Sequence, residues 1–458
     1  MAQQALRESV AGLMAQAWQD LQRLVAIESV ADPQQYPPQR CLEAAEYVRE
    51  AASGAGIEQC RLLDMPDGHP AVFGHTPASA GAPTVLLYCH YDVQPPLDDD
   101  AWLSPPFQLT QRDGRWYGRG AADCKGNVVA HLTALRALGG GERAGGAGGF
   151  PVGIKLIAEG AEEQGTGGLE EFVRRQPEML AADVVIVLDV GNFTVGVPTV
   201  TTSLRGIASV VVTVRTLQAA MHSGMFGGPA PDALIALARM IATLHDEQGD
   251  TAITGVACDQ GWSGVDYPQQ QFRSDAQMLD GVALIGNGNV AEMLWARPSV
   301  NVLGIDCPAV AGSTASLQPQ ARARVSLRVP PGMDPLGAQD ALIAHLEAVA
   351  PWGAQVEIER DMVAAPFAAR IDGPAYECMG QAMELAFEAQ MTTAGEGGSI
   401  PLCTVLQETY PEAEIILMGV EEPQCLIHAA NESVDPREIE RVALAEALFL
   451  RSCADLRR

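Results

Sequence analysis

Four short apolar segments of this sequence are each followed by acidic or histidine side chains. They are His90 and Asp92 after residues 84–89, Glu162 and Glu163 after 152–158, Asp189 after 183–188, and His428 after 414–419. A His-x-Asp or Glu-Glu pair by itself is usually an exposed polar pair without a function. Four such placements mean more, because the carboxyl ends of strands in an open α/β sheet meet at one ligand-binding edge. Imidazoles and carboxylates gathered there could bind metal ions and activate water.

A fifth acidic residue, Asp123, lies in a glycine-rich motif that runs from Gly118 to Gly126. The motif nearly matches the G-x-G-x-x-G pattern of dinucleotide-binding loops, but aspartate replaces the last glycine. A carboxylate repels a pyrophosphate at that position, so the motif favours a cation over a nucleotide. Asp123 is therefore a further candidate metal ligand.

The number of these side chains suits a pair of metal ions. Two co-catalytic ions need about three protein ligands each, and a bridging carboxylate counts for both, so about five ligands suffice. The candidate ligands are His90, Asp123, Glu163, Asp189 and His428. Asp92 and Glu162 remain for catalysis; Asp92 lies two residues beyond His90 on extended chain, faces the same way and can orient its imidazole. The imidazoles favour zinc, while the carboxylates keep manganese and cobalt as alternatives.

The apolar segments that precede these residues have the pattern of buried strands. They are continuous apolar runs, typical of strands covered on both faces. Helical spacing occurs between and around them, at residues 13–30, 40–56, 126–138, 169–176 and 374–389. We therefore predict an α/β domain with a mostly parallel sheet flanked by helices. The glycine-rich stretch 139–149 indicates a surface connection.

Residues 206–362 show a different pattern. Alternating strands are predicted at 208–214 and 322–329, helices at 232–246 and 335–349, and a further strand at 355–359. These elements predict an α+β domain. The sequence after residue 366 returns to the first pattern, so we expect 206–362 to be inserted into a discontinuous α/β domain of residues 1–205 and 363–458.

Length and composition exclude several classes of protein. The 458 residues exceed what one core usually serves, so two domains are expected. The net charge of −28 repels nucleic acid and anionic membranes, and we expect neither as a partner. No apolar run approaches the roughly 20 residues that span a bilayer. Ten cysteines without a C-x-x-C pair indicate reduced thiols and a cytoplasmic protein.

Seven short motifs are spread in order over essentially the whole chain. They are His90-Tyr91-Asp92-Val93, Gly118-Arg119-Gly120 with Lys125-Gly126, Glu159-Gly160 with Glu162-Glu163, the run from His222 to Gly228, Ser326-Leu327-Arg328, Gly397-Gly398-Ser399-Ile400-Pro401, and Ile427-His428 with Asn431-Glu432. Together they resemble the zinc aminoacylase/carboxypeptidase superfamily of metallopeptidases, and within it the branch of cytosolic nonspecific dipeptidases and carnosinases.

The resemblance implies a role for each residue of the metal site. One ion would be held by His90 and Asp189, the other by Glu163 and His428, and Asp123 would bridge them. Glu162 would be the general base, and Asp92 would orient the site. A cis peptide bond is also implied between Asp123 and Cys124.

The resemblance further implies that the inserted lid and dimerisation domain binds substrate. Arg328 would hold the terminal carboxylate of the substrate through paired hydrogen bonds, and Ser399 and the backbone of Gly398 would donate nearby. His222 would stabilise the oxyanion in a partner subunit, which implies a homodimer formed through this domain. From the residues alone, Arg328 could equally be a surface arginine paired with an acidic residue, and His222 an ordinary loop histidine.

The expected activity is hydrolysis of the amide bond of dipeptides or short peptides with a free C-terminal carboxylate, using water activated between two metal ions. An N-acyl amino-acid deacylase with the same site is the alternative. A binding protein with a vestigial metal site is disfavoured, because Glu162 is present beside all five ligands. One departure concerns the substrate: many members of the family carry arginine before Glu-Gly-Gly-Ser-Ile-Pro, where this chain has Gly395.

Overall fold

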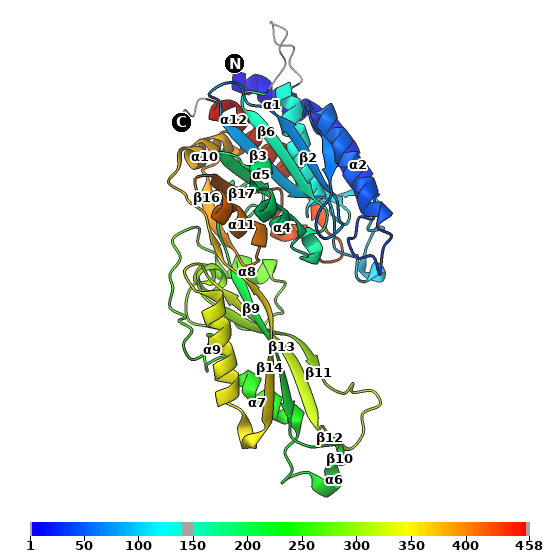
Figure 1. Ribbon diagram of the computed structural model, residues 1–458, viewed down its shortest axis with the longest axis vertical. Coiled ribbons are helices and arrows are strands. Elements are labelled where there is room, and N and C mark those ends of the chain that lie inside the picture. Colours follow the sequence, from blue (N-terminus) through cyan, green and yellow to red (C-terminus); the bar gives the residue numbers. More distant parts are fainter. Residues whose placement is uncertain (1, 140–149, 455–458) are drawn as a thin grey trace. The chain divides into compact units, whose positions relative to one another are not determined.

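The computed structural model describes residues 2–139 and 150–454 and divides into two compact units (Figure 1). The first unit is formed from Met1–Thr202, Ala369–Ala394 and Leu402–Arg458, and the second from Ser203–Ala368 and Gly395–Pro401. The predicted insertion, 206–362, lies within the second unit, which also takes in the short segment around Ser399. Of the glycine-rich connection at 139–149, all but Gly139 lies outside the described residues.

A nine-stranded sheet in the described part of the chain is formed mainly by residues of the first unit. Its order is β1-β2-β6-β3-β7-β17-β8-β15, with β16 paired to β8. The four central strands are parallel: β6 (Gly153–Glu159), β3 (Thr84–His90), β7 (Val184–Leu188) and β17 (Glu414–Met418). Antiparallel strands flank them, namely β1 (Arg61–Leu63), β2 (Ala71–Thr76), β8 (Thr199–Leu204) and β15 (Phe367–Ala368). Strand β16 (Thr392–Glu396) pairs with β8. The predicted fold class, α/β with a largely parallel sheet, is confirmed.

The central strands are buried because helices cover both faces of the sheet (Figure 1). One layer shares a hydrophobic core with the sheet and consists of α1 (Ala2–Val25), α2 (Gln39–Gly54), α3 (Lys125–Gly139), α10 (Pro374–Phe387) and α12 (Pro436–Cys453). The other face carries α4 (Gly168–Arg175), α5 (Pro177–Leu180) and α11 (Pro401–Thr409) (Figure 1). Helix α3 packs against both α1 and α12, and its residues from Lys125 to Leu135 are buried. This packing holds the first turn of the helix in place.

Short elements complete the first unit. They are the small antiparallel sheet of β4 (Thr110–Arg112), β5 (Arg115–Tyr117) and β18 (Ser433–Val434), and the 3-10 turns η1 (Asp99–Ala101), η2 (Glu162–Gln164) and η5 (Pro423–Cys425). None of the helices in the described ranges combines the length and the apolar character that crossing a membrane requires.

The second unit is built on an antiparallel sheet in the order β11-β13-β9-β14. Its strands are β11 (Ser299–Asp306), β13 (Gln320–Val329), β9 (Gly206–Arg215) and β14 (Gln355–Ala364). Helices α7 (Ala233–Ala242) and α9 (Pro335–Ala348) pack on one face, where alternate valines of β9 and β13 form the core. The remaining elements are β10 (Met221–His222) paired with β12 (Ser316–Leu317), α6 (Ser223–Phe226), α8 (Gln269–Asp275), the π-helix η3 (Glu292–Ala296) and the turn η4 (Pro351–Gly353).

Two predicted helices end earlier than their apolar spacing suggested. The helix predicted at 13–30 begins at Ala2 and ends at Val25, because the following residues form a buried turn in which Ser29 bonds to both neighbours of Asp92. The helix predicted at 232–246 ends at Ala242; its start is correct, since Asp232 accepts hydrogen bonds from the first turn as an N-cap. Tertiary contacts therefore set both C-terminal ends.

Candidate active site

Adjacent strand ends bring the predicted metal ligands together in the first unit. His90 is the last residue of β3, Asp189 follows β7, Glu163 lies in η2 after β6, Asp123 precedes α3, and His428 lies beyond β17 and η5. Because β6, β3 and β7 are neighbours and parallel, their carboxyl ends lie along one edge of the sheet. The position of the site at this edge agrees with the sequence prediction.

Two groups of close contacts share Asp123. His90 Nε2 lies 3.0 Å from Asp123 Oδ1 and 3.0 Å from Asp189 Oδ1. His428 Nε2 lies 2.9 Å from the other oxygen, Asp123 Oδ2, and 3.1 Å from Glu163 Oε2. Ligand atoms about 2.1 Å from a tetrahedral ion are about 3.4 Å apart, so each group has nearly the spacing of ligands around one ion. All five predicted ligands are thus brought together, with Asp123 between the two histidines.

The pKa values of these groups reflect their mutual contacts. Burial raises the pKa of Asp123, but hydrogen bonds from His428 and His90 outweigh burial and hold it below its usual value. Hydrogen bonds with Asp123 and Glu163 raise the pKa of His428 to about 11. Burial raises the pKa of Glu163 and Asp189. Three carboxylates and two imidazoles gathered at one largely buried place are a donor set that fits divalent cations.

Asp92 is completely buried and contacts both ends of the predicted site. Its Oδ1 atom lies 3.3 Å from His90 Nδ1, the ring atom opposite the Nε2 that faces Asp123. Its two oxygens also accept hydrogen bonds from the backbone N–H groups of Glu162 (3.2 Å) and Glu163 (3.1 Å). The backbone carbonyl oxygen of Asp92 is a further partner of His90 Nδ1, at 3.1 Å. The contacts to the backbone of the glutamate pair were not indicated by the sequence.

Glu162 lies beside the candidate ligand Glu163 in the turn η2 and is partly buried. Burial, and then the negative charge of Asp189, raise the pKa of Glu162 well above its usual value. A carboxyl group in this environment holds a proton more readily than one in water, which suits a group that must accept and return a proton.

The loop that carries Asp123 is fixed by a buried ion pair. Glu432 and Arg119 are both nearly inaccessible, and Arg119 Nη1 lies 2.7 Å from Glu432 Oε2. The Glu432 carboxylate also accepts hydrogen bonds from the N–H groups of Gly120, Ala122 and Asp123, at 3.0 to 3.1 Å. The peptide bond between Asp123 and Cys124 is cis, as the resemblance implied. Glu432 was part of a motif without a role, and its contacts show that it positions the Asp123 loop.

The residues predicted to bind the substrate carboxylate lie together in the second unit. Arg328 Nη1 donates to Ser399 Oγ at 3.3 Å, and Ser399 Oγ donates to the carbonyl oxygen of Arg205. Burial lowers the pKa of Arg328. The N–H group of Gly398, predicted to face substrate, donates instead to Glu396 Oε1 at 3.3 Å.

Arg205 is a second arginine at this place that the sequence analysis missed. It is 7% exposed, its Nη1 donates to Ser299 Oγ at 2.8 Å, and its Nε finds no hydrogen-bond partner in the described part of the chain. Burial, and then the positive charge of Arg328, lower the pKa of Arg205 to about 10. In the sequence, Arg205 stands at the predicted domain boundary, and no motif or residue spacing there indicates a binding role for it.

His222 is an exposed residue of the second unit, in the short strand β10 opposite Ser316. Its Nδ1 atom accepts a hydrogen bond from the backbone N–H of Gly224 at 3.1 Å and so caps helix α6. This bond requires the proton of a neutral ring to be on Nε2, which leaves Nε2 as a donor.

Three further side chains that were not predicted lie close to the candidate metal ligands. Gln94 Nε2 donates to Glu163 Oε2 at 2.8 Å. Ligand atoms of Glu421 lie with those of Asp123 and Asp189 within 4.8 Å of one another, and the same holds for Cys124 with His90 and Asp189. Glu421 could have been found by the strand-end rule, since it lies shortly after the end of β17. No sequence signal distinguished Cys124 or Gln94.

Comparison with known proteins places this site in a family. Residues 86–452, which include all the candidate metal ligands, match the family model described as peptidase family M20/M25/M40. The chain belongs to this family. The predicted resemblance to metallopeptidases is therefore confirmed, and the protein is a metallopeptidase.

Individual members give a closer comparison. A cysteinylglycine-S-conjugate dipeptidase from Corynebacterium striatum is 43% identical over 412 residues, which cover 89% of each chain. A Beta-Ala-His dipeptidase from Rattus norvegicus is 27% identical over 462 residues, covering 94% of this chain and 92% of the relative. The crystal structure of human carnosine dipeptidase 1 superposes with a TM-score of 0.85 at 23% identity, covering 100% of this chain and 99% of that one. The shared fold thus extends over both units.

Proposed function

We propose that this peptidase hydrolyses dipeptides that have a free C-terminal carboxylate, with a pair of divalent metal ions. The observation that carries the proposal is the placement of Asp123, whose two oxygens face His90 and His428 separately. The names of the relatives support the substrate class, since both are dipeptidases. Zinc suits the two imidazoles, and manganese or cobalt remains compatible with the carboxylates.

The chemistry that two divalent ions supply in such a site is a lower pKa for a bound water and polarisation of the scissile carbonyl. His90 and Asp189 would hold one ion and Glu163 and His428 the other, and Asp123 would contribute to both. Glu162 accepts the proton of the attacking water on its carboxylate and returns it to the amine as the amide bond breaks. Asp92 keeps the His90 ring and the backbone of Glu162 in place during both transfers.

The second unit supplies substrate recognition in this proposal. Arg328 binds the terminal carboxylate, and Ser399, already bonded to Arg328, donates beside it. The buried charge of Arg205 adds to the positive potential there, because neither arginine forms an ion pair among the described residues. Glycine at position 395 is required by packing, since a Cβ there would lie 2.6 Å from Trp295 Cβ.

The proposal includes a homodimer formed through the second unit and a cytoplasmic location. His222 donates from Nε2 to the oxyanion that forms on the substrate carbonyl in the partner subunit. Its capping bond to Gly224 supports this role, because it orients the ring and directs the free N–H outward.

The proposed activity predicts a defined response to metal removal. Purified protein treated with a chelator should lose hydrolysis of alanyl and cysteinyl dipeptides, and zinc, manganese or cobalt should restore it, because the bound ions lower the pKa of the attacking water. The measurement is amino-acid release from a dipeptide panel, with N-acetyl amino acids as the comparison and metal content determined on the same samples. Hydrolysis of N-acetyl amino acids without dipeptide hydrolysis would replace the proposal with a deacylase.

Replacement of Arg328 with glutamine should raise KM for dipeptides by about 10- to 100-fold and change kcat less, because charge-assisted hydrogen bonds contribute about 1.5–3 kcal/mol. Hydrolysis of the same dipeptides with amidated C-termini should be slow in the unmodified enzyme and little affected by the substitution. Arg324→Gln is the matched control, since Arg324 lies exposed on the same strand and pairs with Asp361. An unchanged KM with an intact preference for free carboxylates would show that Arg328 has another role.

A further inference from the structure

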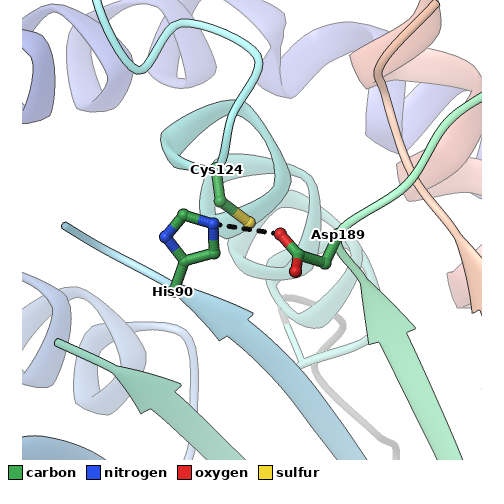
Figure 2. Close-up of side chains that lie close together, drawn as sticks. All are labelled: His90, Cys124 and Asp189. Carbon is green, nitrogen blue, oxygen red and sulfur yellow. Dashed lines mark ion pairs between the residues drawn. The ribbon is translucent and has the colours of Figure 1, made fainter. Parts of the chain in front are cut away.

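The thiol of Cys124 lies within the group of side chains that contains the first predicted metal position. The ligand atoms of His90, Cys124 and Asp189 are all within 4.8 Å of one another. Figure 2 shows the sulfur pointing toward the contact between the His90 imidazole and the Asp189 carboxylate, in which the two ligand atoms are 3.0 Å apart. The three residues come from the end of β3, the start of α3 and the end of β7.

Cys124 is held in this place by the packing around it. The residue is completely buried, and its thiol donates to the carbonyl oxygen of Leu188, the residue before Asp189, at 3.1 Å. The sulfur is thus fixed beside the backbone of Leu188, within reach of the ligand atoms of His90 and Asp189. The thiol is therefore a fixed donor at the side of the cluster and not a flexible side chain that visits it.

We propose that Cys124 is a ligand of the metal ion held by His90, Asp189 and Asp123, and that it makes the two metal positions unequal. This inference rests on the proposed metal pair. Coordination forms a metal–sulfur bond in place of the S–H bond, and the proton passes to solvent. The first ion then has four protein ligands, which complete a tetrahedral site with a sulfur donor, and it accepts water only by expanding to five ligands.

The second ion keeps three protein ligands, Asp123, Glu163 and His428, and an open position for water. The histidines of the two positions also differ in solvent exposure: the His90 side chain is 1% exposed, and the His428 side chain is 54% exposed. The first ion is therefore retained tightly, and the second exchanges with solvent. Because a thiolate favours zinc over manganese, the first position selects zinc, whereas the second, with oxygen and imidazole donors, also admits manganese.

Titration of metal-free protein with Co²⁺ tests the assignment by absorption spectroscopy. Binding of the first equivalent should produce a sulfur-to-cobalt charge-transfer band in the near ultraviolet, and the second equivalent should add visible cobalt bands without increasing it. Cys124→Ser and Cys124→Ala should lack the band and lower the preference for zinc over manganese at the first position by about tenfold or more. Cys41→Ser is the control, since Cys41 is equally buried but belongs to no candidate metal group in the described ranges.

The spectrum of the unmodified protein decides the inference even if the Cys124 variants do not fold. Two bound Co²⁺ ions without a sulfur band would overturn the role of Cys124 and leave the proposed metal pair intact. Failure to bind Co²⁺ at all, with zinc and manganese also absent from the protein, would overturn the metal pair and the inference together. A band that survives in Cys124→Ser would assign the sulfur to another cysteine and likewise refute the proposal.

Discussion

Glu162→Gln is expected to lower kcat by about 10²- to 10⁴-fold, the range that a positioned general acid or base contributes. Glutamine keeps the size of the side chain and its ability to accept a hydrogen bond, but it cannot take up the proton of the attacking water. The backbone of residue 162 would stay anchored to Asp92, because that bond uses the main-chain N–H. Metal content, measured by elemental analysis, should therefore remain near that of the unmodified protein.

Steady-state kinetics on an alanyl dipeptide at saturating zinc would measure this effect. Glu171→Gln serves as the control, because Glu171 belongs to the following helix, is exposed and pairs with Arg175 on the surface. Its kcat should be unchanged. A Glu162→Gln enzyme that kept more than about a tenth of its turnover would show that another group moves the proton.

Asp123→Asn is expected to weaken the binding of both metal ions at once. Loss of a supporting residue outside the ligands typically costs 10- to 100-fold in metal affinity, so loss of a carboxylate shared by two ions should cost at least about 100-fold. At present, Nε2 of His90 and Nε2 of His428 each face one carboxylate oxygen of Asp123. In the variant, the amide nitrogen would replace one of these oxygens and direct its N–H donors at one of the two histidines. Calorimetric titration of metal-free protein would measure the change for each ion.

Two variants make this test specific. Asp113→Asn is the matched control, since Asp113 lies in an exposed turn at φ 49°, a conformation that asparagine adopts as readily as aspartate. Asp189→Asn should weaken chiefly the ion held by His90. Binding of two ions by Asp123→Asn with unchanged affinities would exclude a bridging role.

Part of the site could be read from the sequence because the signals are local. His90 and Asp189 stand at the ends of apolar strands, and such ends meet at one edge of a parallel sheet. Asp123 stood out because it replaces a glycine in a motif that would otherwise suggest a nucleotide. Glu421 shows the limit of such local signals: it lies shortly after β17 and joins Asp123 and Asp189, but the sequence pattern pointed to His428, further along the same segment.

The α/β fold class was also predictable, since buried parallel strands are continuous apolar runs and amphipathic helices repeat with their own period. The ends of the elements were not. Helix α1 ends at Val25 because Ser29 bonds to the backbone of Tyr91 and Val93, in the segment that follows β3 some sixty residues along the chain. Such contacts depend on how segments pack and leave no mark on the local pattern.

The sequence by itself determined which side chains could bind metal ions and accept a proton, because residue type and distance from a strand end are properties of the chain. Only the tertiary structure decided which of these side chains contact one another. One oxygen of Asp123 faces each histidine, and Asp92 contacts both His90 and the glutamate pair. Glu432 holds the loop that carries Asp123. It also decided that the thiol of Cys124 faces His90 and Asp189. Side-chain direction at a turn follows from backbone geometry and from the packing of distant segments, and no residue pattern within one segment specifies either.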